Sequence, residues 1–260
     1  MTKIIAIANQ KGGVGKTTTS GSMSASLKKK GYKVLTIDLD PQGNLSDSVG
    51  ADTLNKPTIY EVIMREATPS EAIQHLIAFD IIPANIMLAT AERKLPETGR
   101  DRRLKMSLES IKKNYDYIIV DTPPSLGILT VNALLFADEV IIPTNAGIFA
   151  TKGIQQLYNS IQDARELAGS NVKIAGILLT RYNPRTIINQ DIKELTEDLA
   201  KNISAPVFNT FIRNAVVVEE AQANSSDIFT YRANSSVASD YDSFVSEYLG
   251  GKNQNGNKEV

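Results

Sequence analysis

The sequence contains no cysteine and a single histidine, His75, in 260 residues. Without cysteine, the chain cannot form a disulfide framework, a zinc–thiolate site or a cysteine-ligated iron–sulfur cluster. One histidine also argues against histidine-based nucleophilic catalysis and against a histidine-rich metal site. Any chemistry of this chain must therefore rest on other side chains.

The chain also lacks long apolar runs and any appreciable net charge. No stretch of 18 apolar residues is present, and the N-terminus leads directly into a strand-like segment, so neither a membrane span nor a signal peptide is expected. We therefore expect a cytoplasmic protein. The formal net charge of −1 provides no overall attraction to nucleic acid, so any DNA binding requires a local basic patch, such as one assembled by dimerisation.

The sequence is 42% hydrophobic, which is enough to bury the core of one α/β domain. Short runs rich in β-branched residues alternate with helix-like segments, and no hairpin signal separates them. This alternation is typical of a doubly wound, mostly parallel sheet flanked by helices. We expect a single domain over residues 1–250, followed by a disordered polar tail over residues 251–260. The expected strands are residues 4–8, 34–38, 79–83, 117–121, 138–144 and 172–180.

The most informative segment is a glycine-rich loop between the first strand and a helix-like segment. Glycines let backbone N–H groups turn inward without a Cβ clash, and the helix N-terminus adds unpaired donors and a positive dipole end. We predict a phosphate-binding loop in which Lys16 reaches the β- and γ-phosphates and the Thr17 hydroxyl binds Mg²⁺. An incidental glycine-rich turn is the alternative, and the flanking strand and helix argue against it. The predicted nucleotide-binding residues of the loop are Lys11, Gly12, Gly13, Val14, Gly15, Lys16, Thr17 and Thr18.

Carboxylates follow two further strands of the predicted sheet. Asp38 and Asp40 stand at the end of one strand, and Asp121 ends another. In an open α/β sheet, ligands bind outside the carboxyl ends of the strands, so all three are expected near the loop. Asp121 fits the Walker B pattern, in which a buried strand delivers a carboxylate to Mg²⁺. A plain turn would also use the Asp-Pro and Gly that follow Asp38, but the neighbouring loop favours the functional interpretation.

The loop departs from the ordinary P-loop, which requires glycine where Gln10 stands, and it begins with a second lysine, Lys11. The form K-G-G-x-G-K-T-T resembles the deviant Walker A motif of the ParA/MinD/nitrogenase iron-protein superfamily. The resemblance implies a P-loop NTPase fold and a nucleotide-sandwich dimer, in which Lys11 reaches the phosphates bound by the partner. The absence of cysteine excludes the iron-protein and cluster-carrier branches.

Two further segments resemble the switch regions of ParA proteins. The pattern D-x-D-P-Q-G-N over residues 38–44 resembles switch I, and residues 122–127 resemble switch II. In switch I the second aspartate positions or activates the attacking water, which assigns that role to Asp40 and a supporting, magnesium-side role to Asp38. The implied catalytic residues are Lys11, Lys16 and Asp40, and the implied metal ligands are Thr17, Asp38 and Asp121.

The resemblance to small ParA/Soj-like proteins covers about residues 3–249. It implies an ATPase that uses ATP and Mg²⁺ and forms a homodimer in the ATP state. Such proteins bind DNA non-specifically during plasmid or chromosome segregation, and a ParB-like centromere-binding partner stimulates their hydrolysis. We therefore expect a nucleoid-associated protein.

The residues that contact DNA are indicated less sharply. The resemblance places Arg185 on the DNA-binding surface and Arg213 at both the nucleotide and the DNA. Val217 stands where many members of the family carry a second arginine. A basic segment, residues 100–105, opens a helix predicted to run to about Asn114. It could touch DNA, and a solvated helix face is the better interpretation.

Two other classes of function stay open. One is a MinD-like positioning ATPase that acts at membranes or on protein cargo, and the other is a nucleotide-switched regulator of transcription or conjugation. MinD-type relatives end in a basic amphipathic helix. The last predicted helix, residues 235–249, carries Asp240, Asp242 and Glu247 but no lysine or arginine, so no membrane partner is expected.

Overall fold

The computed structural model describes residues 1–147 and 150–255 of the chain. In this part of the chain, seven strands form one sheet in the order β3-β4-β2-β5-β1-β6-β7. Every pair of neighbouring strands is parallel except β3 and β4 at one edge. The predicted mostly parallel sheet is therefore confirmed. The strands are β1 (Lys3–Ile7), β2 (Val34–Asp38), β3 (Gln74–His75), β4 (Asp80–Ile82), β5 (Tyr117–Asp121), β6 (Glu139–Asn145) and β7 (Lys173–Thr180).

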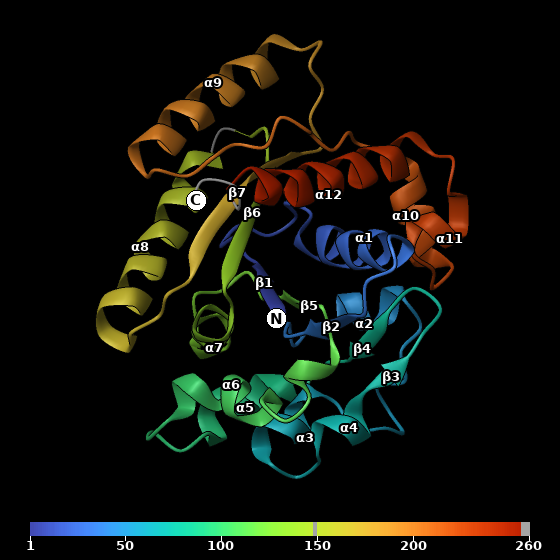
Figure 1. Ribbon diagram of the computed structural model, residues 1–260, viewed down its shortest axis with the longest axis vertical. Helices are drawn as coiled ribbons and strands as arrows, with labels where there is room; N and C mark the ends of the chain where they lie inside the picture. Colours follow the sequence, from blue (N-terminus) through green and yellow to red (C-terminus); the bar gives the residue numbers. More distant parts are fainter. Residues whose placement is uncertain (148–149, 256–260) are drawn as a thin grey trace.

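Helices cover both faces of the sheet, and each face has its own apolar core (Figure 1). One core lies under α3, α5, α6, α7 and α8, and the other under α1, α11 and α12. The α-helices are α1 (Lys16–Lys29), α2 (Asn44–Ser48), α3 (Ile59–Met64), α4 (Pro69–Ala72), α5 (Leu88–Lys94), α6 (Arg103–Leu108), α7 (Ile128–Phe136), α8 (Ala150–Ala168), α9 (Ile187–Asn202), α10 (Val216–Ala223), α11 (Ile228–Arg232) and α12 (Ser236–Asn255). Two short 3₁₀ helices are η1 (Arg100–Arg102) and η2 (Lys112–Asn114).

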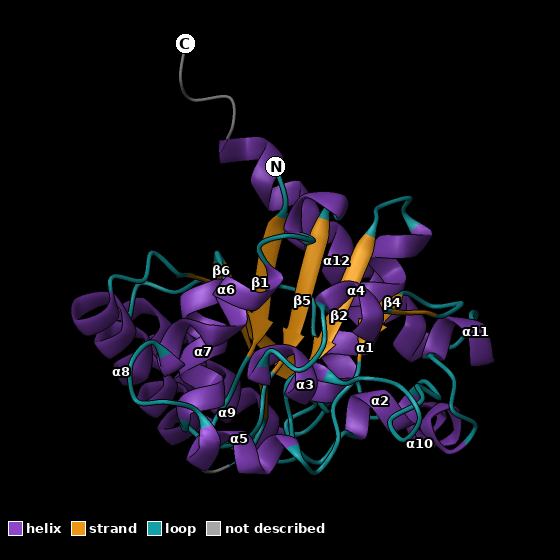
Figure 2. Cartoon of the chain, turned by 90° about the horizontal axis from the view of Figure 1, so that it is seen from below, coloured by secondary structure: helices purple, strands orange, loops and turns teal. Residues whose placement is uncertain are grey.

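The central strands are apolar along their whole length because both of their faces are buried. All five residues of β2 and all five of β5 are buried, as expected for parallel strands between two helical layers. The two strands pair in register, so that Asp38 lies opposite Asp121 at their carboxyl ends. Figure 2 shows the central strands running in one direction, away from the N-terminus. This register therefore brings the two acidic motifs together at the carboxyl ends of the parallel strands.

Two predicted elements differ from the structure, and one short strand was not predicted. Helix α4 ends at Ala72, and His75 lies on the antiparallel edge strand β3, where its Nδ1 is 2.9 Å from Asp80. The helix expected over residues 100–114 is broken into η1, α6 and η2. Helix α12 continues to Asn255, through the first half of the segment predicted as a disordered tail, while residues 256–260 lie outside the described residues.

No helix in the described part of the chain is both long and apolar enough to span a membrane.

Candidate active site

The glycine-rich loop connects β1 to α1 at the carboxyl ends of the parallel strands. Gly13 and Gly15 have φ values of +70° and +80°, a left-handed conformation that side chains disfavour. The loop is also held from outside, because the Thr180 hydroxyl at the end of β7 donates to the Val14 carbonyl at 2.9 Å. These features fix the shape of the loop backbone, and the first N–H groups of α1, which have no partner within the helix, are available to a phosphate.

Lys16 is the buried cation of this loop. Its side chain bends back so that Nζ donates to the Lys11 carbonyl at 3.2 Å. Burial lowers the pKa of Lys16, and the nearby carboxylates of Asp121 and Asp40 oppose that shift. A buried ammonium group that donates to a neutral carbonyl gains strongly from a phosphate oxygen, because the anionic oxygen is the stronger acceptor.

Asp121 and Thr17 form the part of the site that suits a metal ion. The Thr17 hydroxyl donates to Asp121 Oδ2 at 2.8 Å, and the Ser20 hydroxyl donates to Oδ1 at 2.8 Å. Burial raises the pKa of Asp121, and the charge of Asp38 raises it further. A hydroxyl beside a buried carboxylate is a set of hard oxygen donors, which is the kind Mg²⁺ prefers. A divalent cation here would also relieve the cost of burying the charge.

Asp38 and Asp40 lie beside that pair but use their oxygens differently. Asp38 Oδ2 accepts bonds from both the backbone N–H and the hydroxyl of Ser46, and Oδ1 accepts from the Asp40 N–H. Burial raises the pKa of Asp38. Asp40 Oδ1 accepts from the Gln42 N–H at 3.0 Å. Asp38 therefore shapes the loop that carries Asp40. These three bonds keep the Asp38 carboxylate next to the proposed metal position, but they use much of its capacity to accept further bonds.

A cavity of about 520 Å³ opens over the loop, a volume that suits a nucleotide. It contains Lys16, Thr17 and Asp40 from the predicted site. Asp121 and Asp38 lie below its surface, fully buried. The residues that line it are Gly12, Gly13, Gly15, Lys16, Thr17, Thr18, Asp40, Gln42, Asn44, Asp47, Ser48, Pro124, Arg181 and Gln222.

The structure places the second lysine of the motif outside that cavity. Lys11 Nζ donates to Asn145 Oδ1 at 3.1 Å, at the carboxyl end of β6, and its backbone N–H donates to Asn9 Oδ1. A Cβ on Gly147 would lie 3.1 Å from the same Nζ. Within one chain, the ammonium group of Lys11 therefore lies against the end of β6 and not in the cavity over its own loop.

The two arginines predicted from the resemblance do not line the cavity either. Arg213 makes a two-point contact with the Asp240 carboxylate of α12, with Nε and Nη2 each 2.7 Å from an oxygen. Arg185 is exposed in the loop before α9. Sequence reasoning missed Arg181, which does line the cavity and has a φ of +51°. Its place directly after β7 is the same positional signal that identified Asp38.

Comparisons with known proteins agree with this geometry. Residues 2–174 match a family described as an AAA domain. The sporulation initiation inhibitor protein Soj of Bacillus subtilis is 40% identical over 245 residues, which cover 93% of this chain and 96% of that protein. The chromosome partitioning protein ParA of Caulobacter vibrioides is 37% identical over 235 residues, covering 88% and 87%. The chain belongs to the ParA/Soj family.

Solved structures place the ParA/Soj chain among nucleotide-binding folds. A structure of cobyrinic acid a,c-diamide synthase from Mycobacterium smegmatis with a bound ATP analogue and magnesium has a TM-score of 0.84 and 34% identity, and the match covers 98% of this chain and 97% of that one. A plasmid partition protein from Borrelia burgdorferi bound to AMPPNP has a TM-score of 0.82 and 26% identity, covering 96% and 100%. The predicted family and fold are confirmed.

In this ParA/Soj chain, the buried charge of Asp121 is expected to cost stability when nucleotide and metal are absent. Because the folded-state pKa is raised, the folded state holds its proton at pH values where the unfolded state has released it. The unfolding free energy therefore falls as the pH rises above the ordinary carboxyl range near about 4. Asp121→Asn keeps a partner for both hydroxyls and removes the charge. In EDTA at pH 8, we expect its Tm to rise by about 2–4 °C, which corresponds to about 1 kcal/mol in a domain of this size.

Thermal unfolding of both proteins at pH 5 and pH 8 measures this effect. The advantage of Asp121→Asn should be larger at the higher pH, and Asp163→Asn on the exposed side of α8 should show no such trend. An Asp121→Asn Tm at or below that of the parent at pH 8 would contradict the assignment of a strained buried charge.

Proposed function

We propose that this chain is an ATP-hydrolysing switch for the segregation of DNA, acting as a homodimer in its ATP state. The observation that carries the proposal is the loop itself. One lysine, Lys16, is buried at the phosphate position, while a second, Lys11, lies 3.1 Å from Asn145, outside the cavity lined by its own loop. Within one subunit, this position keeps Lys11 away from the phosphates that its own loop would bind. In a face-to-face dimer, Lys11 can reach the phosphates bound by the partner.

Within one subunit, the geometry supports binding of ATP with Mg²⁺. The loop amides and Lys16 would bind the β- and γ-phosphates, and Thr17 and Asp121 would hold the metal, with Asp38 beside them. When bound, Mg²⁺ neutralises charge on the phosphates. The mycobacterial relative with an ATP analogue and magnesium, 34% identical to this chain, supports the assignment.

The protein forms no covalent bond to the substrate in this reaction and acts by positioning groups and stabilising charge. Charge that develops on the γ-phosphoryl oxygens is stabilised by Lys16 and by the loop N–H groups, which are already oriented. Asp40 lies on the cavity wall, where its second oxygen can accept a hydrogen bond from an attacking water. The products are ADP and phosphate. In the dimer, Lys11 adds a positive charge from the partner, so full activity requires both subunits.

The segregation role rests on the relatives. The Caulobacter protein is named for chromosome partitioning, and the Borrelia structure is described as a plasmid partition protein. We therefore propose that the dimer binds DNA non-specifically in the nucleoid and that a ParB-like protein triggers hydrolysis. Arg185 and Arg213 are the proposed DNA contacts. Arg213 would engage phosphate only by loosening its pair with Asp240.

A regulatory role is the second candidate, because the most similar of the relatives described above is named an inhibitor of sporulation initiation. The same nucleotide-controlled dimer would serve both roles. A neighbouring ParB-like reading frame would favour segregation over regulation.

Binding to DNA tests the proposal. With Mg²⁺ and a non-hydrolysable ATP analogue, affinity for unrelated 40-base-pair duplexes should be similar, and it should be much weaker with ADP. A dimer that neutralises about four phosphates loses about 100-fold in affinity between about 50 and 200 mM salt. Arg185→Ala or Arg213→Ala should each lower the slope of log affinity against log salt by about one per lost contact. Equal binding with ADP and the analogue, or a flat salt response, would count against DNA tethering.

A further inference from the structure

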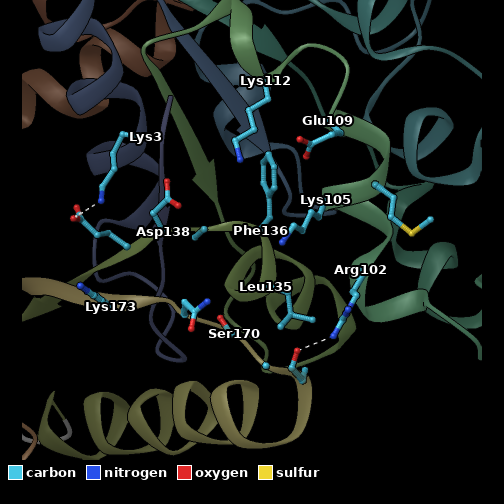
Figure 3. Close-up of a pocket in the computed structure, with 16 residues that line it drawn as sticks. Lys3, Arg102, Lys105, Glu109, Lys112, Leu135, Phe136, Asp138, Ser170 and Lys173 are labelled. Atoms are coloured by element: carbon cyan, nitrogen blue, oxygen red, sulfur yellow. Dashed lines mark hydrogen bonds and ion pairs between the residues drawn. The ribbon is translucent and has the colours of Figure 1, made fainter. Parts of the chain in front are cut away.

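A second cavity in the described part of the chain lies at the opposite ends of the strands from the phosphate-binding loop. Its volume is about 750 Å³. It includes Lys3, Glu139 and Lys173, which begin β1, β6 and β7, whereas the loop follows the carboxyl end of β1. Figure 3 shows this cavity between the strand starts, α6 and the turn before β7. None of its lining residues belongs to the ATP site described above.

Basic side chains dominate the charge of this cavity. Lys3 is neutralised by Glu139 at 2.6 Å. Among the described residues, Lys105, Lys112 and Lys173 have no carboxylate within ion-pair distance. Figure 3 shows Lys105 and Lys112 extending toward the side chain of Phe136.

Arg102 is the fourth cation of the cavity, beside Lys105, Lys112 and Lys173. Two carboxylates, those of Glu109 and Asp138, offset part of this charge. Arg102 Nη2 donates to the Ala168 carbonyl at 2.9 Å, which leaves most of its N–H donors available. Asp138 Oδ2 accepts from the Ile4 N–H at 2.8 Å, and Glu109 is exposed. The cavity therefore keeps an excess of two positive charges after its internal pair is discounted.

Apolar groups complete the lining. Leu135 and Phe136, from the end of α7, and Met106 from α6 line the cavity between the cations. Met106 is 56% exposed, which is high for a large apolar side chain. A concave site of about 300–1,000 Å³ with an apolar part and a few convergent charges is typical of small-ligand sites.

We propose that this cavity binds a phosphorylated small molecule of about nucleotide size, with the phosphate held by Lys105 and Lys112, which extend toward Phe136 (Figure 3), and with Arg102 and Lys173 adding positive charge at its sides. The size of the cavity favours a small molecule over a nucleic acid, and its apolar part favours an organic phosphate over free phosphate. The proposal gives a role to the basic segment 100–105, because Arg102 and Lys105 line the same cavity and are more than a solvent-exposed helix face. It is independent of the function proposed for the ATP site.

Lysine labelling with pyridoxal 5′-phosphate tests the site directly, because this probe carries a phosphate, a ring and an amine-reactive aldehyde. Imines are reduced with borohydride and mapped by mass spectrometry, which distinguishes label on the cavity lysines from label on Lys11 and Lys16 of the ATP site. We expect Lys105, Lys112 or Lys173 to be labelled about tenfold more readily than the exposed control lysines Lys56 and Lys113.

Competition separates the sources of phosphate. AMP should protect the cavity lysines at lower concentration than inorganic phosphate does, and a 20-base-pair DNA duplex should not protect them. K105E/K173E should weaken AMP protection of Lys112 at least about tenfold, whereas the matched charge reversal K56E/K113E should not. Circular dichroism confirms that both variants are folded. Uniform labelling, protection by DNA alone, or equal protection by AMP and phosphate would overturn the proposal.

Discussion

Lys16→Ala is expected to abolish ATP hydrolysis and to weaken nucleotide binding severely. Lys16 is the buried cation of the loop, and its Nζ lies 3.2 Å from the Lys11 carbonyl, so its loss removes the buried positive charge from the phosphate-binding loop. Loss of one preorganised group that stabilises developing charge typically lowers turnover by about 10²- to 10³-fold. Steady-state phosphate release and calorimetric titration with Mg–ATP measure the two effects.

The matched control for Lys16→Ala is Lys113→Ala, which removes an exposed lysine from η2, away from the ATP cavity. It should retain the parent rate. Hydrolysis by Lys16→Ala within a few-fold of the parent would show that the loop does not bind the transferred phosphoryl group.

Asp40→Ala should separate binding from hydrolysis. Asp40 contacts the cavity but does not belong to the Thr17–Asp121 pair, so Mg–ATP binding should survive. Loss of a group that orients or activates the nucleophile typically lowers the rate by about 10²- to 10⁴-fold. The variant should therefore accumulate as an ATP-bound dimer, visible as a larger species on gel filtration that persists for as long as ATP remains bound.

Asp40→Asn refines that experiment. The asparagine oxygen can still accept the Gln42 N–H bond, so the loop keeps its shape while the charge is lost. We expect this variant to be as slow as Asp40→Ala. If Asp40→Asn hydrolysed ATP at the parent rate, Asp40 would act only by shaping the loop, and another group would position the water.

Sequence patterns predicted the sheet and the loop because both depend on local signals. Buried parallel strands appear as short β-branched runs, and a phosphate-binding loop needs glycines at fixed spacing, so β2, β5 and the segment 11–18 were identified from their own residues. The edge strand β3 was not, since two residues carry almost no periodicity. Its antiparallel pairing with β4 is decided by tertiary contacts alone.

The residues that the sequence did not reveal at the site act across long separations. Thr180 supports Val14 from 166 positions away, and Asn145 binds Lys11 from 134 positions away. Ser20 follows the motif directly, yet its bond to Asp121 spans 101 positions. Such partners depend on which strands are neighbours and in what register, which one sequence does not specify. The roles predicted for Arg185 and Arg213 stay predictions.

The dimer is the claim on which the rest depends, and the molar mass in solution tests it most directly. Sedimentation velocity is run with Mg²⁺ and either ADP or a non-hydrolysable ATP analogue. We predict a monomer with ADP and a dimer with the analogue. Lys11→Ala should still bind the analogue, and its dimerisation should be at least about tenfold weaker, because one cationic contact is lost from each site. A parent protein that stays monomeric with the analogue, or a Lys11→Ala variant that dimerises equally well, would contradict the account.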